Sequence, residues 1–276
     1  MNPSAAYSMG SVRIGDGSLV VIGGPCVIEN REITIDTAFF LADICRTHNV
    51  GFVFKASYLK ANRTSVHSYT GPGLYEGLEI LSKVSSEVGC PVLSDVHETN
   101  EIDAVIDVVD VLQIPAFLCR QTALLIKAGS SGKSVNIKKG QFLAPENMKH
   151  AIEKVEQGGG TSISVTERGT FFGYGDLVVD MRSFTTMKSF GYPVFFDVTH
   201  STQRPGGLGT ATGGNRELSG PLSRAAVAYG IDGLYMEVHP RPNEALSDAA
   251  CQLEYKSAER IISDAVRIHN LMREIR

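Results

Sequence analysis

The chain has 276 residues, of which 43% are hydrophobic, so it can bury a sizeable core and is neither a disordered chain nor a small disulfide scaffold. Its 26 basic and 30 acidic residues give a net charge of −4, and no Lys/Arg run is long enough to bind a polyanion, which argues against a nucleic-acid partner. Its apolar stretches are far shorter than the roughly 20 residues of a membrane-spanning helix, so we expect no membrane partner.

The amino terminus and the cysteines indicate the compartment. The first seven residues lack both a basic start and an apolar core, so the sequence predicts no secretory signal. The cysteine count is odd and no Cys-x-x-Cys pair occurs, which is typical of a reducing compartment and not of a disulfide framework. We therefore expect a cytoplasmic protein with free thiols at Cys26, Cys45, Cys90, Cys119 and Cys251.

Eight short runs rich in Val, Ile and Phe end in polar residues, as buried parallel strands do. In chain order they cover residues 19–22, 51–55, 91–95, 110–113, 135–138, 162–166, 193–197 and 233–237. Between them, apolar residues recur three or four apart, as at Leu74, Leu78 and Leu81. Eight strand–helix units predict that residues 1–276 form a single α/β domain, a closed (β/α)8 or TIM barrel. No Gly-x-Gly-x-x-Gly follows the first strand, which disfavours a dinucleotide-binding sheet.

Two segments lie outside the repeating units. Residues 1 to about 17 precede the first strand, and within them residues 7–17 predict a short hairpin that closes the bottom of the barrel. Residues 201–220 follow the seventh strand and are rich in glycine. Because the active sites of such barrels lie at the carboxyl ends of the strands, this glycine-rich loop is a candidate lid.

Six cations are expected at the mouth of the barrel, where they follow strands two, four, five and six. They are Lys55, Lys60, Arg63, Arg120, Lys138 and Arg168. Each alone is equally explained as a surface charge, but a group without anionic partners would repel itself, so the grouping predicts a ligand with several negative charges. Arg and Lys are the residues that bind phosphate and carboxylate. Lys138 is also a candidate Schiff-base nucleophile.

A second group of side chains combines a thiol, an imidazole and two carboxylates. Cys26 follows the first strand and His200 follows the seventh. Glu237 ends the eighth strand, and Asp248 lies eleven residues after it. In a closed barrel the eighth strand pairs with both the first and the seventh, so these positions become neighbours. The set suits a divalent transition metal, namely Fe²⁺, Zn²⁺, Mn²⁺ or Co²⁺. Alone, the thiol is equally explained as a small buried apolar residue and the imidazole as a hydrogen-bonded strand-end group. Further candidates near strand ends are His97 and His239.

The sequence Lys-Ala-Asn-Arg-Thr-Ser at 60–65 resembles the Lys-Ala-Asn-Arg-Ser-Ser signature of the 3-deoxy-D-manno-octulosonate 8-phosphate synthase family. The similarity continues at 67–73, 94–98, 113–122, 136–139, 195–200 and 237–240. It implies a (β/α)8 enzyme, usually a homotetramer, that condenses phosphoenolpyruvate with D-arabinose 5-phosphate and water. The products are 3-deoxy-D-manno-octulosonate 8-phosphate and phosphate, in a step of Kdo and lipopolysaccharide biosynthesis.

The resemblance also implies a subclass and a role for each residue. Metal-dependent members carry Cys at the position of Cys26, where metal-free members carry Asn, and Ser-Asp-Ala at 247–249 also matches the metal-dependent subclass. The implied metal ligands are Cys26, His200, Glu237 and Asp248. The implied catalytic residues are Lys55, Lys60, Asp95, Lys138, His200 and Asp248. The implied substrate-binding residues are Lys55, Ser57, Lys60, Asn62, Arg63, Thr64, Gln113, Lys138 and Arg168, together with Arg120 from a neighbouring subunit.

Two alternatives of function stay open. The related 3-deoxy-D-arabino-heptulosonate 7-phosphate synthases use erythrose 4-phosphate as acceptor and typically have Lys-Pro-Arg-Thr where this chain has Lys-Ala-Asn-Arg, so Asn62 favours the pentose acceptor. A non-catalytic phosphosugar-binding barrel is the more distant alternative. For the enzyme, we expect C3 of phosphoenolpyruvate to attack the acceptor aldehyde while water adds at C2, with loss of phosphate by C–O cleavage.

Overall fold

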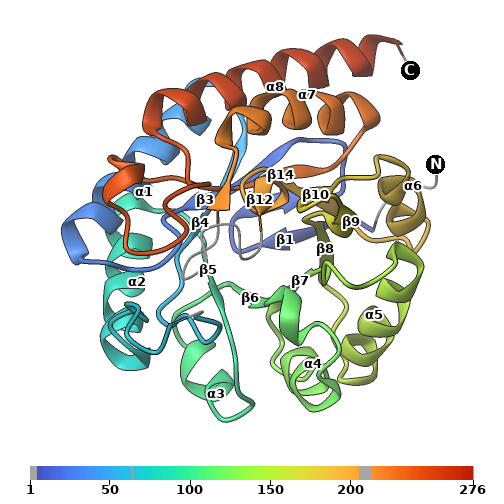
Figure 1. The fold of residues 1–276 in the computed structure, drawn as a ribbon. Coiled ribbons are helices and arrows are strands. Elements are labelled where there is room, and N and C mark those ends of the chain that lie inside the picture. The colour runs from blue at the N-terminus through green and yellow to red at the C-terminus, as the bar shows by residue number, and fades with distance from the viewer. Residues whose placement is uncertain (1–4, 64, 205–212, 276) are drawn as a thin grey trace.

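The computed structural model describes residues 5–63, 65–204 and 213–275. In that part of the chain, parallel strands close into a barrel in the order β11-β14-β3-β4-β5-β6-β7-β8, which lies at the centre of Figure 1. The barrel strands are β3 (Val20–Gly24), β4 (Gly51–Lys55), β5 (Val92–Asp95), β6 (Val111–Ile114), β7 (Ser134–Lys138), β8 (Ile163–Glu167), β11 (Val194–Asp197) and β14 (Gly233–Glu237). Each predicted run is one of these strands, with bounds that agree to within two residues, so the predicted barrel is confirmed.

A helix follows each barrel strand, and the helices form the outer ring seen in Figure 1. They are α1 (Arg31–Thr47), α2 (Leu74–Val88), α3 (Ile102–Val105), α4 (Thr122–Gly129), α5 (Met148–Gln157), α6 (Arg182–Lys188), α7 (Ser219–Tyr229) and α8 (Tyr255–Ile275). Short 3-10 helices cover Ala116–Leu118, Pro145–Asn147, His200–Thr202, Arg216–Leu218 and Pro242–Glu244. None of the helices in the described ranges is long and apolar enough to cross a membrane.

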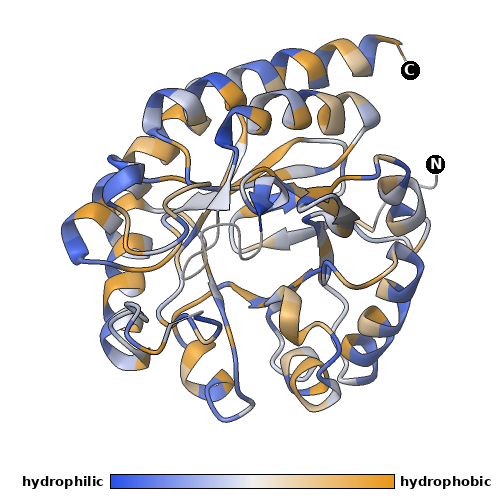
Figure 2. Cartoon of the chain, viewed as in Figure 1, coloured by the Kyte–Doolittle hydropathy of each residue, from blue (hydrophilic) through white to orange (hydrophobic). Residues whose placement is uncertain are grey.

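The outer helices are amphipathic, and Figure 2 shows apolar and hydrophilic turns side by side along them. Leu78 and Leu81 of α2 are buried, as their spacing predicts. Helix α1 begins where the Asn30 side chain accepts the Ile33 N–H at 2.9 Å. Helix α2 ends at Gly89, whose φ of 73° is left-handed. Local sequence therefore sets both where these helices lie and where they stop.

The amino-terminal segment forms the predicted hairpin from β1 (Tyr7–Met9) and β2 (Val12–Ile14), which pair antiparallel. Met9 and Ile14 are fully buried and belong to the apolar cluster inside the barrel. Ser134, the first residue of β7, donates from its hydroxyl to the Ser8 carbonyl at 3.1 Å. The hairpin therefore packs at the amino-terminal ends of the strands, opposite the end where the predicted site residues lie.

Two further hairpins follow barrel strands at their carboxyl ends. Strands β9 (Thr170–Gly173) and β10 (Asp176–Val178) follow β8 and were not predicted. Strands β12 (Gln203–Arg204) and β13 (Gly213–Gly214) belong to the predicted lid at 201–220. The Arg204 guanidinium donates to the Asp176 carboxylate, with 3.1 Å between Nη2 and Oδ2, so the two hairpins are in contact. Residues 205–212 of the predicted lid lie outside the described residues.

Candidate active site

The carboxyl ends of the barrel strands surround a cavity of about 260 Å³. This is the end at which TIM barrels hold their active sites. Strand β14 pairs with both β11 and β3, as barrel closure predicts, and places Glu237 opposite Gly24. Of the residues predicted for the site, those that line the cavity are Lys55, Lys60, Asn62, Asp95, Gln113, Lys138, Arg168, His200 and Glu237.

Two lysines lie near the same oxygen of the Glu237 carboxylate. Lys55 ends β4 and is fully buried, and its Nζ donates to Glu237 Oε1 at 3.0 Å and to the Cys26 carbonyl at 2.9 Å. Lys60 Nζ lies 3.9 Å from the same Oε1 and 3.9 Å from Asp95 Oδ2. Burial alone would lower the pKa of Lys55, but Glu237 and Asp95 raise it, so this ammonium group stays charged.

Lys138 forms a second buried ion pair across the cavity. Its Nζ lies 2.6 Å from Asp197 Oδ2 and 3.5 Å from the centre of the Tyr235 ring, a cation–π distance. The same Oδ2 is 2.8 Å from His200 Nδ1, so lysine and imidazole share one carboxylate. Burial lowers the pKa of Lys138, and Asp197 opposes that shift. The salt bridge engages Nζ as a donor, which disfavours the alternative of a Schiff-base nucleophile.

The charges at this mouth are balanced, which corrects one step of the sequence argument. Glu237 pairs with Lys55, Asp197 pairs with Lys138, and Asp95 adjoins Lys60. The cations therefore need no polyanion to offset their mutual repulsion, although the argument from sequence assumed that they would.

Unpartnered polar atoms give better evidence for a ligand. Arg168 is 5% exposed, and its guanidinium donates through Nη2 to Gln203 Oε1 at 2.6 Å. Several buried atoms of cavity-lining residues have no hydrogen-bond partner among the described residues, namely Arg168 Nη1, Gln113 Oε1, Gln141 Oε1 and the Tyr235 hydroxyl. Because buried polar groups are nearly always hydrogen-bonded, these atoms point to a polar ligand or to water in the cavity.

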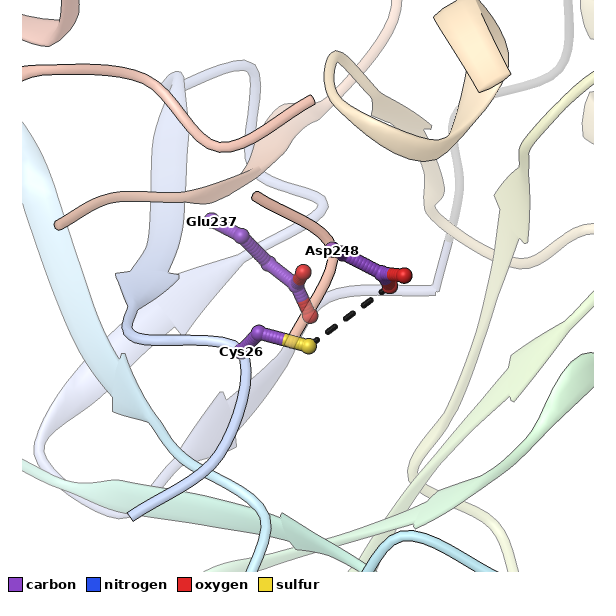
Figure 3. Close-up of side chains that lie close together, drawn as sticks. All are labelled: Cys26, Glu237 and Asp248. Carbon is purple, nitrogen blue, oxygen red and sulfur yellow. Dashed lines mark hydrogen bonds between the residues drawn. The ribbon is translucent and has the colours of Figure 1, made fainter. Parts of the chain in front are cut away.

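Three of the four predicted metal ligands converge beside the cavity. One ligand atom each from Cys26, Glu237 and Asp248 lies within 4.8 Å of the others, and Figure 3 shows the Glu237 carboxylate beside the Cys26 thiol, which a dashed line joins to the Asp248 carboxylate. The fourth, His200, lies outside that mutually close group but borders it. Its Nε2 is 3.5 Å from Asp248 Oδ2 and 3.7 Å from Glu237 Oε1. The structure therefore brings the predicted set together around one edge of the mouth.

The local backbone explains how these donors meet. A Cβ atom on Gly24 would lie 2.1 Å from the Lys55 carbonyl oxygen, so only glycine lets the end of β3 approach β4 two residues before Cys26. Asp248 has a left-handed φ of 45°, which is uncommon for a residue with a side chain. A thiol sulfur, an imidazole nitrogen and two carboxylate oxygens are a donor set that fits a divalent transition metal.

Neighbouring charges tune these donors. Burial alone would raise the pKa of Glu237, but His200, Lys55 and Lys60 lower it to about 2. Burial alone would lower the pKa of His200, whereas Asp197 and Glu237 raise it. Burial and the nearby Glu237 carboxylate raise the pKa of the Cys26 thiol. Because metal ligands must be deprotonated, a metal at this position would displace protons from the sulfur and the imidazole.

The residues implied for the acceptor lie farther out. Asn62 lines the cavity and is exposed. Arg63 donates to Ser247 Oγ at 2.7 Å and to the Tyr69 carbonyl at 2.7 Å. Arg120 is exposed and does not line the cavity, and Thr64 lies outside the described residues. Ser57 is fully buried, does not line the cavity and donates to Asp95 Oδ2 at 2.6 Å, so it orients the carboxylate of a cavity residue.

Comparison with known proteins agrees with this site. Residues 3–272 match the model of the DAHP synthetase I family. The chain belongs to this family. A protein of Geobacter sp. (strain M21) is 56% identical over 242 residues, which cover 87% of this chain and 89% of that relative. Relatives from Syntrophotalea carbinolica and Fusobacterium nucleatum are 51% and 50% identical, over 94% and 95% of this chain and 94% of each relative. All three are named 2-dehydro-3-deoxyphosphooctonate aldolase, a synonym of 3-deoxy-D-manno-octulosonate 8-phosphate synthase.

In this member of the DAHP synthetase I family, the structure adds residues that sequence reasoning missed. Asp197 ends β11 just as Asp95 ends β5, so its place at the end of a strand is the signal that could have found it. Tyr235 lies within an apolar run, and nothing in the run shows that its ring faces Lys138. Of the two extra histidines, His97 lines the cavity, whereas His239 is turned toward Glu29, 3.5 Å away.

Proposed function

We propose that this chain catalyses the condensation of phosphoenolpyruvate with D-arabinose 5-phosphate and water to give 3-deoxy-D-manno-octulosonate 8-phosphate and phosphate. The observation that carries the proposal is the convergence of four cations at one cavity, with a Cys-His-carboxylate group beside it, in a chain whose relatives carry the matching name. Asn62 supports the pentose acceptor, because the heptulosonate synthases typically have Arg at that position.

Phosphoenolpyruvate has a phosphate and a carboxylate, and the inner cavity offers a cation for each. Arg168 Nη1 is buried without a partner among the described residues, so it is available to an anionic oxygen. Lys60 and Lys138 line the same cavity, beside Asp95 and Asp197. Their ammonium groups are further donors for a substrate anion. Gln113 is held against Asp95 by a hydrogen bond, which leaves its Oε1 toward the cavity as an acceptor.

The acceptor would bind at the outer part of the mouth, near Asn62 and Arg63. Its phosphate needs a further cation, and we assign Arg120 of a neighbouring subunit to it. The exposure of Arg120 and its absence from the cavity lining of its own chain support that assignment. The corresponding assembly is a homotetramer. The five buried free cysteines support a reducing, cytoplasmic location.

We assign a divalent transition metal to Cys26, His200, Glu237 and Asp248. When bound, such a metal supplies Lewis acidity toward a carbonyl oxygen or toward water. Fe²⁺, Zn²⁺, Mn²⁺ and Co²⁺ all accept this donor set. The assignment is supported by donor chemistry and by the short distances among the ligand atoms.

The protein's own residues account for orientation and charge. C3 of phosphoenolpyruvate attacks the acceptor aldehyde as water adds at C2, and the resulting hemiketal phosphate releases phosphate by C–O cleavage. Charge builds at C2 and on the departing phosphate, beside the preorganised ammonium and guanidinium groups of Lys138 and Arg168. The loop at 201–220 would exclude bulk water, which limits hydrolysis of phosphoenolpyruvate.

Phosphate release tests the proposed reaction. The chain is mixed with phosphoenolpyruvate and either D-arabinose 5-phosphate or erythrose 4-phosphate. Release with the pentose and little with the tetrose is the expected result. The reverse preference would indicate a heptulosonate synthase, and binding of both substrates without release would indicate a non-catalytic phosphosugar-binding protein.

Removal of the metal tests the subclass. Exhaustive dialysis against dipicolinate is expected to abolish activity, and addition of Mn²⁺ or Co²⁺ is expected to restore it. The Cys26→Asn variant should bind metal more weakly yet keep some activity, because metal-free members of the family carry Asn there. Full activity after dialysis would show that Cys26 is structural.

A further inference from the structure

The hydroxyl of Ser247 lies between a proposed metal ligand and a proposed acceptor-binding residue. Its Oγ is 2.9 Å from Cys26 Sγ and 2.7 Å from Arg63 Nη1. The three side chains come from three different loops, which follow β14, β3 and β4. Ser247 is only 4% exposed and Cys26 is fully buried, so the contact belongs to the interior of the mouth.

The direction of the two hydrogen bonds follows from the chemistry of the groups. A guanidinium can only donate, so Ser247 Oγ accepts a hydrogen bond from Arg63 Nη1. The single hydroxyl proton of the serine is then free to point at the Cys26 sulfur. A cysteine that ligates a metal has lost its own proton and can only accept, so in the metal-bound protein this direction is fixed.

The backbone on both sides of this contact is held by one buried side chain. Gln252 is fully buried. Its Oε1 accepts the Cys26 N–H at 3.2 Å, and its Nε2 donates to the Ser247 carbonyl at 2.8 Å. The distance between sulfur and hydroxyl is therefore set by two backbone anchors and does not depend on a freely rotating surface side chain.

Arg63 is committed to the protein through each of its donor nitrogens. In addition to Ser247, it donates from Nε to the Tyr69 carbonyl at 2.7 Å and from Nη2 to the Leu246 carbonyl at 3.4 Å. A phosphate that bound Arg63 would compete with these acceptors for the same N–H groups. Any change at Arg63 would then reach the Cys26 sulfur through the serine hydroxyl.

We propose that Ser247 is a positioning residue that couples Arg63 to the Cys26 sulfur, so that the acceptor site and the metal site influence one another. The inference rests on the proposed function, since it takes Cys26 as a metal ligand and Arg63 as part of the acceptor site. Hydrogen bonds to ligand atoms tune metal affinity. Coupling between two binding sites is reciprocal, so the effect of Arg63 must be measurable on the metal alone.

Cobalt titration of the metal-stripped full chain tests the coupling without an activity assay. Bound Co²⁺ reports a cysteine ligand through its sulfur-to-metal charge-transfer absorption. Ser247→Ala is expected to weaken Co²⁺ binding about tenfold and to shift that absorption band. Ser247→Thr keeps the hydroxyl and should restore both. Ser223→Ala is the matched control, because Ser223 is also buried but its hydroxyl bonds within α7, to the Ser219 carbonyl.

Arg63→Met is the decisive variant, because it leaves the serine and all proposed ligands in place. It is expected to weaken Co²⁺ binding about fivefold in the unsubstituted chain and to have no further effect in the Ser247→Ala chain. If Ser247→Ala does not fold, as circular dichroism would show, Ser247→Gly, which also removes the hydroxyl, takes its place in this comparison.

Two results would overturn the coupling and leave the metal site standing. One is Co²⁺ affinity and absorption in Ser247→Ala equal to those of the unsubstituted chain, and the other is an Arg63→Met effect of the same size with and without the serine hydroxyl. Absence of the charge-transfer band in the unsubstituted chain would instead overturn Cys26 as a ligand, and the coupling with it.

Discussion

At the scale of single residues, the pair of Lys138 and Asp197 shows what burial demands of a charge. Both side chains are almost fully buried, and Nζ and Oδ2 are 2.6 Å apart. Removal of Lys138 leaves the buried Asp197 carboxylate desolvated, with the His200 imidazole still 2.8 Å from Oδ2, so part of its charge compensation is lost. We expect Lys138→Met to lower the free energy of unfolding by about 3 kcal/mol.

Urea denaturation measures this loss. Lys149→Met is the control, since Lys149 is 61% exposed and 3.8 Å from Glu153, and its loss should cost less than about 0.5 kcal/mol. A loss for Lys138→Met no larger than the control's would contradict the pairing.

Glu101 ties stability to acid pH. Its Oε2 accepts hydrogen bonds from the Tyr58 hydroxyl at 2.8 Å and from the His97 N–H at 2.9 Å. Burial alone would raise its pKa, but the hydrogen bonds from His97 and Tyr58 lower it to about 2 from the ordinary 4.5. The unfolded chain therefore takes up this proton at a higher pH than the folded chain. Stabilisation by Glu101 is complete above pH 4.5 and is lost as the pH falls toward 2.

The Glu101→Gln variant should accordingly be less stable at neutral pH and should lose less stability on acidification. The urea midpoint, followed from pH 7 down to pH 3, measures the slope for the variant and the unsubstituted chain. Glu87→Gln, at an exposed position on α2, serves as control and should retain the original slope. An unchanged slope in Glu101→Gln would exclude Glu101 as the source.

Sequence reasoning found site residues that end strands, and it missed those whose role depends on where the side chain points in the folded protein. Lys55, Lys138 and Glu237 end their strands, and a strand end in a barrel can face only the mouth or the helices. The roles of Ser247, which the resemblance marked only as part of a subclass pattern, and of Tyr235 were missed because they rest on contacts with residues far away in the sequence. Charge balance was missed for the same reason, since Asp197 reveals its partner only in three dimensions.

At the scale of elements, the barrel strands could be predicted because burial on both faces makes them continuous apolar runs. The hairpin of β9 and β10 could not be predicted, because its strands have only four and three residues, too few for a regular alternation of apolar and polar side chains to show. Helix α3 has only four residues, which is less than two turns, so a helical period cannot show in it.

The hairpin of β1 and β2 is expected to stabilise the barrel from below. Ile14 is fully buried inside the barrel, and its neighbour Arg13 is exposed. We expect Ile14→Ala to lower the free energy of unfolding by about 2–4 kcal/mol, because it leaves a cavity in the packed interior. Arg13→Ala, on the same strand, should change it by less than about 0.5 kcal/mol. Equal effects in chemical denaturation would show that the hairpin is not part of the cooperative core.

At the scale of the whole molecule, the proposed sharing of Arg120 predicts complementation between subunits. Arg120→Ala and Lys138→Met are each expected to be nearly inactive as pure proteins. Subunits of the two variants, mixed and allowed to exchange, should regain activity, because an Arg120→Ala subunit keeps Lys138 and receives Arg120 from its neighbour. Phosphate release by the mixture measures the effect.

Lys60→Met mixed with Lys138→Met is the control for this experiment. Both lysines line the cavity of their own chain, so every subunit in this mixture lacks one of them. An arginine from a neighbouring subunit cannot replace the missing lysine. Recovery in the control to the same extent, or no recovery in the first mixture, would contradict a shared Arg120.

The hairpin beneath the barrel has a consequence for the order of events in turnover. Because Met9 and Ile14 pack into the amino-terminal end of the barrel, the cavity opens only at the carboxyl ends of the strands. Whatever binds deepest must arrive first and depart last along one route. A sugar phosphate bound in the outer part of the mouth would therefore block the exit of phosphoenolpyruvate from the inner cavity. Excess arabinose 5-phosphate should therefore slow the escape of bound phosphoenolpyruvate, a behaviour that a through-channel would not show.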